Sequence, residues 1–372
     1  MKLTIERAAL LKSLAHVQSV VERRNTIPIL SNVLIEAGEA AVGLSATDMD
    51  LTIVESVAAE VLEPGATTVP AHTLYDIVRK LPEGAPIELT TGGEDARLTM
   101  RAGRSVFALS TLPKEDFPVQ GTADLPHRFT LEPKELRNLI DRTRFAISTE
   151  ETRYYLNGIY LHTVEADSLA MLRAVATDGH RLARFEMPLP EGAAGMPGVI
   201  VPRKAVGEVR KLIDEAEDPV EVALSETQIR FAFDSIVLTS KLIDGTFPDY
   251  ERVIPAGNDK NVRVDCRAFA EAVDRVSTIS TEKSRAVKLA VNDGVMTLSA
   301  NSPEHGMANE EIEVAYDGPP IEIGFNSRYL LDIADQIKDG EAEISMADAS
   351  SPTIMRDVAD ASALYVLMPM RV

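Results

Sequence analysis

The residues best suited to chemistry lie in one stretch, residues 174–183, which reads Ala-Val-Ala-Thr-Asp-Gly-His-Arg-Leu-Ala. Asp178 and His180, joined by a serine from elsewhere, could supply the acid, base and nucleophile of a hydrolase. The sequence contains no Gly-x-Ser-x-Gly elbow, no phosphate-binding Gly-x-x-x-x-Gly-Lys-Ser/Thr loop, no Gly-x-Gly-x-x-Gly and no His-Glu-x-x-His. Its six histidines and single cysteine lack metal-ligand spacing. We therefore expect a protein that is not an enzyme, without catalytic residues, metal or cofactor.

The same stretch also has a structural interpretation as a β-hairpin. Alternating apolar residues enter and leave a Thr-Asp-Gly turn, in which Asp178 and Gly179 are expected to supply the positive-φ positions of a tight turn. Asp178 can cap such a turn as easily as it can orient an imidazole. The arrangement recurs at residues 44–54 and, more loosely, at 298–314, about 125–130 residues apart. This spacing predicts three copies of one module.

Composition and charge indicate an acidic globular protein. The chain has 372 residues, 45% of them hydrophobic and 26% charged, with a net charge of −20 at pH 7. That length favours two or three domains. The negative balance gives no general attraction to nucleic acid or anionic membranes, so a nucleic-acid site must be a local basic surface. The lone Cys266 is typical of a reducing cytoplasm. The strand-like residues 2–5 directly after Met1 predict that there is no signal peptide, and the lack of a long apolar run predicts that there is no membrane span. We therefore expect a cytoplasmic protein.

Each module contains two strand–helix units followed by further strands. Apolar residues at i, i+3, i+4 and i+7 predict helices with one buried face, over residues 10–17, 74–81, 136–140, 206–213, 269–276 and 329–337. Strand-like runs precede every helix, and Pro, Gly and polar residues cluster near 121–126 and 255–261. We therefore predict an α+β protein of three tandem similar domains, 1–122, 127–254 and 259–372, each built from two half-repeats of helix plus antiparallel sheet.

Several strings distributed over the whole chain resemble the bacterial sliding clamps, the β subunits of DNA polymerase III. They are Pro28-Ile29-Leu30, Arg153-Tyr154-Tyr155-Leu156-Asn157-Gly158, the 176–183 stretch, Ile200-Val201-Pro202-Arg203-Lys204, Ser240-Lys241-Leu242, Phe247-Pro248-Asp249-Tyr250 and Met368-Pro369-Met370-Arg371. The resemblance implies three clamp domains per chain and a head-to-tail homodimer. In such a ring, helices line the hole and sheets form the outside. It also implies a processivity factor for DNA replication that encircles double-stranded DNA without reading its sequence.

A ring that slides on DNA needs basic side chains, because phosphate contacts by Lys and Arg are independent of sequence. By resemblance, Arg24, Tyr154 and Tyr155 match DNA-contact positions, whereas Glu150 replaces the family's glutamine. Of the two tyrosines, only one is expected to point inward. The basic helix residues that could line a hole are Arg24, Lys80, Arg137, Arg203, Lys204, Arg210, Lys211, Arg275, Lys283 and Arg285. Arg203 and Lys204 are our additional candidates for DNA contact.

A second implied site is the family's groove for partner peptides. The matching positions are Leu156, Thr177, Gly179, His180, Arg181, Leu182, Pro248, Arg252, Val253, Val366, Met368, Pro369, Met370 and Arg371. Met and Leu form adaptable apolar walls, and Arg or His at the rim can fix a peptide. The implied partners are the replicative polymerase, an ATP-driven clamp loader and other proteins that carry clamp-binding motifs.

For the joint of the ring, the resemblance implies that Phe107 and Leu109 face Thr278 and Ile279 of a second copy. Thr278 stands where the family can have a larger aliphatic residue, which predicts a weaker joint. Two alternatives remain open at this point. One is the hydrolase considered above. The other is a monomeric adaptor that shares the peptide groove but never encircles DNA.

Overall fold

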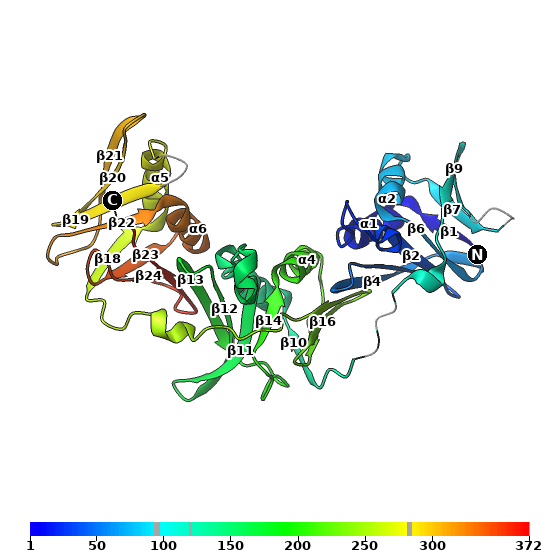
Figure 1. Cartoon of the computed structure of the whole chain (residues 1–372), viewed down its shortest axis with the longest axis horizontal. Helices are drawn as coiled ribbons and strands as arrows, with labels where there is room; N and C mark the ends of the chain where they lie inside the picture. The colour runs from blue at the N-terminus through cyan, green and yellow to red at the C-terminus, as the bar shows by residue number, and fades with distance from the viewer. Residues whose placement is uncertain (93–96, 119–120, 122, 281–284, 372) are drawn as a thin grey trace. The chain divides into compact units, whose positions relative to one another are not determined.

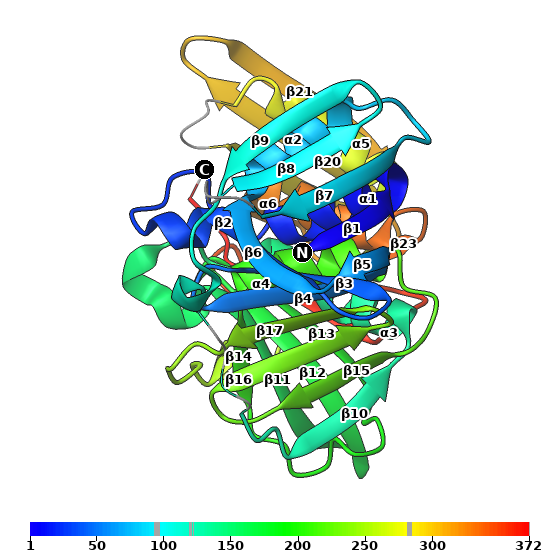
Figure 2. The ribbon, with the colours of Figure 1, turned by 90° about the vertical axis from the view of Figure 1, so that its right-hand side faces the viewer.

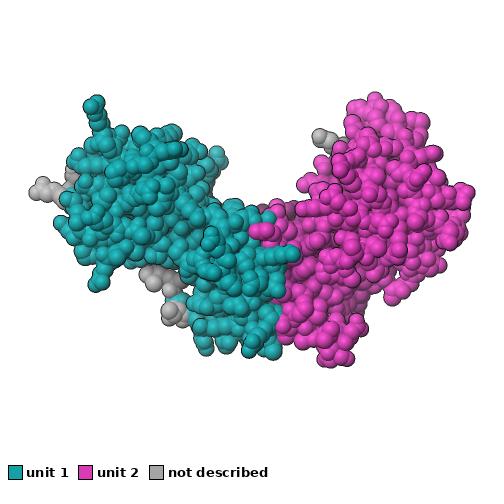
Figure 3. Space-filling model, turned by 180° about the vertical axis from the view of Figure 1, so that it is seen from behind, with its two compact units in different colours: residues 1–136, 190–197, 204–242 teal, residues 137–189, 198–203, 243–372 magenta. Residues whose placement is uncertain are grey.

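The computed structural model describes residues 1–92, 97–118, 121, 123–280 and 285–371. The chain divides into two compact units, which Figure 3 colours separately. Unit 1 comprises residues 1–136, 190–197 and 204–242, and unit 2 comprises residues 137–189, 198–203 and 243–372. The middle one of the three predicted domains is therefore shared between the two units.

Unit 1 contains the N-terminal elements and part of the middle of the chain. In chain order its elements are β1 (Lys2–Glu6), α1 (Arg7–Gln18), η1 (Pro28–Ser31), β2 (Asn32–Ala37), β3 (Ala41–Thr47), β4 (Leu51–Ala58), β5 (Glu60–Glu63), β6 (Gly65–Pro70), α2 (Ala71–Lys80), β7 (Pro86–Thr91), β8 (Arg97–Ala102), β9 (Ser105–Ser110), η2 (Lys114–Asp116), β10 (His127–Leu131), α4 (Arg203–Ile213), β15 (Val220–Leu224), β16 (Gln228–Phe233) and β17 (Ile236–Lys241). The helix α3 (Pro133–Asp141) crosses the boundary between the units, and α4 has its first residue in unit 2.

Two antiparallel sheets form the frame of unit 1. Among the described residues one has the order β5-β1-β7-β8-β9 and the other β10-β15-β16-β17-β4-β3-β2-β6. Figure 2 shows the second sheet, in which β17 lies beside β4. The register runs from Ile236 opposite Glu55 to Ser240 opposite Leu51. Because this pairing joins strands from the first and middle predicted domains, the two share one continuous sheet.

Unit 2 repeats this plan with the rest of the chain. Its elements are η3 (Arg144–Ala146), η4 (Glu151–Leu156), β11 (Gly158–Ala166), β12 (Leu169–Thr177), β13 (Arg181–Pro188), β14 (Val199–Pro202), η5 (Tyr250–Val253), β18 (Lys260–Asp265), α5 (Cys266–Ser277), β19 (Ala286–Asn292), β20 (Val295–Ser302), β21 (Gly306–Glu313), β22 (Ile321–Asn326), α6 (Ser327–Ile337), β23 (Glu341–Met346), β24 (Thr353–Asp357) and β25 (Ala363–Leu367). The described strands form the orders β14-β11-β12-β13-β25-β24-β23-β18 and β21-β20-β19-β22. Here the β13–β25 pair joins the middle and last predicted domains.

The helices form where the apolar spacing predicts them. In α1 the buried side chains Leu10, Leu14 and Val17 recur at helical spacing, and α1 packs against α2 in unit 1 as α5 packs against α6 in unit 2 (Figure 1). Complete burial of such a leucine stabilises the fold by about 1.5–3 kcal/mol. The Asp265 carboxylate caps α5 by accepting the N–H of Ala268 at 2.7 Å. No helix among the described residues is long and apolar enough to cross a membrane.

All three predicted hairpins are present, as β3–β4, β12–β13 and β20–β21. The helix expected over residues 74–81 is α2, Ala71–Lys80, and Leu81 lies just beyond its end. Such displacements of a few residues are normal at helix ends, where side-chain periodicity carries little information.

Candidate functional site

The turn between β12 and β13 is held by its own side chains. Oδ1 of Asp178 accepts the backbone N–H groups of His180 at 2.9 Å and of Arg181 at 3.0 Å. The Thr177 hydroxyl donates to the Arg181 carbonyl at 2.6 Å and accepts the Gly179 N–H at 3.1 Å. Asp178 therefore acts as a capping residue of the turn, as Asp commonly does.

The geometry of this turn corrects one expectation. Gly179 has φ +87°, but Asp178 is not among the described residues with positive φ. Thr177 pairs with Leu182, so four residues separate the paired positions, and such a loop does not need two consecutive left-handed residues. Gly179 also makes room for a neighbour, because a Cβ there would lie 2.6 Å from Nη1 of Arg153.

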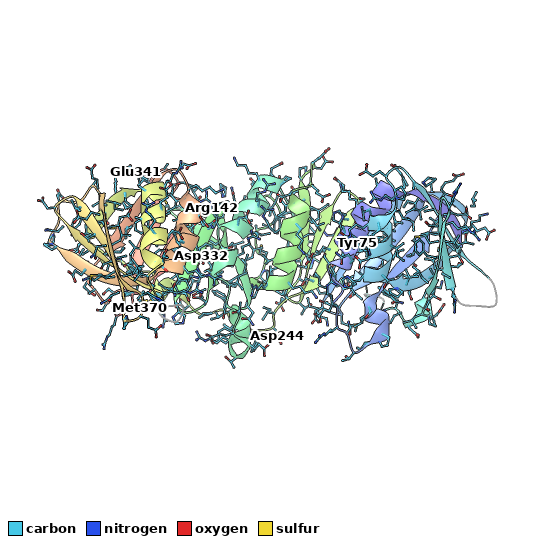
Figure 4. All side chains as sticks on the ribbon, turned by 90° about the horizontal axis from the view of Figure 1, so that it is seen from above. Tyr75, Arg142, Asp244, Asp332, Glu341 and Met370 are labelled. Carbon is cyan, nitrogen blue, oxygen red and sulfur yellow. The ribbon has the colours of Figure 1, made fainter. Side chains whose placement is uncertain are left out.

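Arg181 is an internal anchor of the site. Its side chain is 9% exposed; Nε donates to Asp178 at 3.2 Å and Nη2 to the Phe145 carbonyl at 2.5 Å. Nη1 donates to the carboxylate of Asp332 in α6, a residue labelled in Figure 4. The guanidinium also lies 4.3 Å from the centroid of the Tyr329 ring. Arg181 therefore ties the turn to α6 and η3, with its charge matched inside the protein.

A hydrophobic cluster lies beneath the turn, and we call it the groove floor. It brings together three residues predicted for the peptide groove, Leu156, Leu182 and Val366. The other buried members of the groove floor are Val175, Ile200, Phe247, Tyr250, Ile354 and Leu364. The predicted positions, far apart in sequence, therefore meet in one apolar cluster of unit 2.

The exposed part of the predicted groove comes from two segments. Val253 and Met368 are large apolar side chains that remain 47% and 43% exposed. The Met368 N–H donates to the His180 carbonyl at 2.9 Å, so the C-terminal segment continues along the turn. Met370, labelled in Figure 4, donates its N–H to the Gly324 carbonyl at 2.9 Å. Apolar side chains at the surface are thus held on an ordered backbone.

The remaining predicted groove residues lie at the rim. His180 is exposed, and its ring lies nearly parallel to that of Tyr329, with centroids 6.5 Å apart. Arg252 is exposed and pairs with Asp249 at 2.7 Å. Pro248 and Arg371 are exposed, whereas Pro369 is half-buried.

Sequence reasoning did not find Tyr329 and Asp332 of α6. Both contact Arg181 through side chains, and neither belongs to a string on which the resemblance rested. Their spacing of three residues places them on one helix face, which is the only signal that the sequence offered. Phe247 and Tyr250 lay in a recognised string, but their place in the groove floor was not predicted.

The predicted DNA-contact residues differ in their exposure to solvent. Tyr154 is 54% exposed, whereas Tyr155 packs against the groove floor, so one of the two tyrosines points inward as expected. Their rings meet edge to face with centroids 5.7 Å apart. Arg24 and Arg203 are exposed. Glu150, at the position of the family's glutamine, pairs with Arg153 at 2.9 Å.

Lys204 is already engaged by acidic groups. Its Nζ lies 2.5 Å from Asp48 and 3.3 Å from Glu22, and it donates to the Val20 carbonyl at 3.2 Å. Burial lowers its pKa, but the hydrogen bond and charge of Asp48, with those of Glu22, outweigh burial and leave the pKa raised. Its charge is therefore largely matched within unit 1.

Other basic candidates also form ion pairs. Arg275 Nη2 lies 2.6 Å from Glu310, Arg210 lies 2.8 Å from Asp214, and Lys211 lies 2.8 Å from Glu208. Lys283 lies outside the described residues. A basic residue type on a helix is thus a poor indicator of a free positive charge.

Two of the predicted joint residues lie on an edge strand, and the other two lie at the end of a helix. Phe107 and Leu109 are half-buried on β9, the last strand of its sheet order, beside the 55% exposed Val106. Thr278 is the C-terminal cap residue of α5, and Ile279 follows it half-buried. The last domain also ends its sheet order at β21. Edge strands expose unpaired backbone groups that can pair with another chain.

Comparison with known proteins covers the whole chain. Family models for the N-terminal, central and C-terminal domains of the DNA polymerase III beta subunit match residues 1–121, 130–249 and 251–371. The Beta sliding clamp of Caulobacter vibrioides NA1000 is 58% identical over 372 residues, with 100% of both chains covered. A crystal structure of the Caulobacter crescentus clamp matches with TM-score 0.98 and 58% identity, over 100% of this chain and 99% of that one. The Bartonella birtlesii clamp bound to griselimycin matches with TM-score 0.97 and 52% identity over 100% of both chains.

Proposed function

The chain belongs to the DNA polymerase III beta-subunit family, and we propose that it performs the clamp's tasks through the residues described above. The family is a non-catalytic processivity factor of DNA polymerase III. Its members bind DNA, form a dimeric ring and bind partners that carry peptide motifs. The match of all three domain models along one chain carries this conclusion, and it disfavours the alternative of a monomeric adaptor.

To act on DNA as a clamp, the protein must stay on the duplex without recognising its base sequence. Closure of a ring supplies retention, so individual phosphate contacts can be weak and exchange rapidly during sliding. We assign DNA contact to Arg24, Tyr154, Tyr155, Arg203 and Lys204. Among them, the exposed Arg24 and Arg203 should contribute more than Lys204, whose charge is shared with Asp48.

We assign partner binding to the groove that lies over the groove floor. The exposed Val253 and Met368 supply apolar contact area, and the capped turn supplies an ordered rim. Arg181 belongs to this site as the anchor of the turn. We propose that griselimycin, which is bound to the Bartonella birtlesii clamp, occupies this groove, and we use it as the probe for partner binding.

We propose that two copies join through Phe107 and Leu109 of one chain and Thr278 and Ile279 of the other. Two identical head-to-tail contacts close under a two-fold axis, so they make a ring instead of a fibre. The exposed edge strand β9 supports this assignment. The domain boundaries 1–122, 127–254 and 259–372 and a cytoplasmic location are part of the proposal, and the family-model ranges support the boundaries.

Small-angle X-ray scattering on an absolute scale tests the assembly. The proposal expects the mass of a dimer and a distance distribution that a hollow ring fits. A compact monomer at tens of micromolar would reject the proposed joint.

A pair of variants then tests the division of sites. Arg24→Ala with Tyr154→Ala should lower DNA retention and leave griselimycin binding unchanged. Deletion of residues 368–372 should do the reverse. Loss of both activities in either variant would show that the two sites are not separate.

A further inference from the structure

A row of polar side chains crosses three neighbouring strands of unit 2. His162 of β11 is paired in register with Arg173 of β12, which is paired with Glu186 of β13. Paired residues in an antiparallel sheet lie on the same face, so the three side chains are neighbours. Nε of Arg173 donates to Glu186 at 2.6 Å, and the Arg173 side chain is only 9% exposed. The row is a built and buried polar feature.

This polar row adjoins the groove floor. Val175 lies two residues from Arg173 on the same strand and therefore on the same face of the sheet. It belongs to the groove floor, as does Tyr250 of η5. The face is thus apolar at one end and polar at the other, and Tyr250 contacts both parts.

The hydroxyl of Tyr250 is the point at which η5 meets the row. Nη1 of Arg173 donates to this oxygen at 3.0 Å, and Nε2 of His162 lies 3.0 Å from it. Arg173 can only donate, so the Tyr250 hydroxyl can use its own proton toward His162. Burial and the charge of Arg173 lower the pKa of His162 to about 4, so its ring is neutral and can accept that proton near pH 7. Every partner in this chain of hydrogen bonds is satisfied.

Two further contacts fix the same segment. Arg173 Nη1 also donates to the Glu251 carboxylate at 2.7 Å. The Phe247 ring stacks on Tyr160 with centroids 4.8 Å apart and planes 9° from parallel. The stretch from Phe247 to Glu251 is therefore held by stacking at one end and by polar contacts at the other. The predicted groove residues Pro248, Arg252 and Val253 lie within it or directly after it.

We propose that Arg173 and Tyr250 are positioning residues for partner binding, which hold in place the wall formed by Pro248, Arg252 and Val253. The inference rests on the proposed peptide site. Apolar contacts have little directional preference, whereas a buried hydrogen-bond network admits few arrangements. A wall fixed before binding loses less conformational entropy when the ligand arrives. The polar row therefore improves affinity without touching the ligand.

The test measures griselimycin binding to the full-length protein by calorimetry. Tyr250→Phe keeps the ring in the groove floor and removes only the hydroxyl. We expect its dissociation constant to rise about fivefold, the order expected for one hydrogen bond. The matched control is Tyr316→Phe, which removes a hydroxyl that donates to the Pro319 carbonyl at 2.7 Å in the same unit. The control should bind as the unaltered protein does.

A double-mutant cycle separates positioning from general destabilisation. If Tyr250 acts through the wall, Tyr250→Phe should have less than about a twofold effect in a Val253→Ala background. Multiplicative effects of the two changes would overturn the inference, as would unaltered binding by Tyr250→Phe. Glu251→Gln, which weakens the second contact of Arg173, should raise the dissociation constant by a smaller factor of about two.

Deletion of residues 368–372 distinguishes this inference from the proposed site itself. If the deletion leaves griselimycin binding intact, or the unaltered chain fails to bind it, the peptide site is wrong and the positioning role falls with it. If the deletion abolishes binding while Tyr250→Phe has no effect, the site stands and only the positioning role is rejected.

Discussion

The turn at Thr47–Leu51 in unit 1 and the turn at Thr177–Arg181 in unit 2 have the same internal hydrogen bonds. In each, the threonine hydroxyl donates to the carbonyl four residues later, at 3.0 Å and 2.6 Å. In each, the aspartate carboxylate accepts the N–H groups two and three residues later. The two turns are therefore copies of one local structure, formed by the same Thr-Asp pair.

In both units a neighbouring strand, β17 or β25, ends with a backbone hydrogen bond to the turn. Lys241 donates its N–H to the Asp50 carbonyl at 2.8 Å, as Met368 does to the His180 carbonyl at 2.9 Å. The side chains at these positions differ. In unit 1, Lys241 and Asp50 form an ion pair at 3.0 Å, whereas in unit 2 the corresponding pair is the exposed Met368 and His180. Different side chains on a matching backbone thus give an ion pair in unit 1 and an exposed Met368 beside His180 in unit 2.

The residues near the ends of α1 and α3 provide a second contrast. His16, near the end of α1, has Nδ1 2.8 Å from Glu55 and Nε2 3.2 Å from Glu215. Arg142, just after α3 and labelled in Figure 4, donates to the Gln336 carbonyl and pairs with Asp360 at 3.6 Å. One region is thus held by a titratable group and the other by a permanent charge.

The largest expected effect is on the stability of the second turn. Arg181→Ala leaves the carboxylates of Asp178 and Asp332 without their buried partner, which should destabilise unit 2 by about 3 kcal/mol. Denaturant unfolding should show a lower midpoint. The control is Arg252→Ala, a change at a side chain 84% exposed, which should stay within about 0.5 kcal/mol. Equal midpoints for the two variants would show that Arg181 is not an anchor.

The next largest effect is expected on ligand binding, when the side chains beside the two turns are exchanged. His180→Asp with Met368→Lys gives unit 2 the charged pair of unit 1, and should weaken griselimycin binding by about 30-fold, or ~2 kcal/mol. The reciprocal change, Asp50→His with Lys241→Met, should leave that binding unaltered. Calorimetry measures both. Retained binding in the first variant would place the site elsewhere.

A smaller, pH-dependent effect belongs to unit 1. Burial lowers the pKa of His16, but Glu55 and Glu215 outweigh it and leave the pKa raised. Both ring nitrogens face carboxylates, which only accept, so both contacts need the protonated ring. The stabilisation is complete below the ordinary pKa of about 6.5 and is lost as the pH rises through the raised value of the folded protein.

The variant His16→Gln tests this pH dependence. It should cost about 1.5 kcal/mol at pH 6 and progressively less above the raised pKa. Lys12, which pairs with Glu215 at 2.8 Å, stays charged over this range and is unchanged in the variant. Thermal unfolding of both proteins from pH 6 to pH 9 measures the difference, and a constant difference would contradict the assignment.

The smallest effect concerns the exposed ion pair of the first turn. Lys241→Ala removes a side chain that is 54% exposed, and such pairs contribute little in water. The free energy of unfolding should fall by less than about 0.5 kcal/mol, and griselimycin binding should not change. A larger loss would show that the charged pair, and not the shared backbone pattern, stabilises this turn.

Local structure and family membership could be predicted from the sequence. The spacing of Leu10, Leu14 and Val17 predicted α1, because one buried face imposes its period on the chain. Apolar runs on both sides of a Thr-Asp segment predicted both turns, and the structure shows that the Thr and Asp side chains hold each turn through local hydrogen bonds. The groove residues Leu156, Leu182 and Val366 were found through family resemblance, and the structure places them in one cluster.

The way in which distant segments combine could not be predicted from the sequence. The pairings of β4 with β17 and of β13 with β25 divide the predicted middle domain between two units, and no local pattern specifies them. The matched charge of Lys204, the anchoring role of Arg181 and the contacts of Tyr329 depend on the same long-range packing. The spacing of apolar residues predicts which face of a helix or strand is buried. It does not predict which other element packs on that face, because that depends on contacts between residues far apart in sequence.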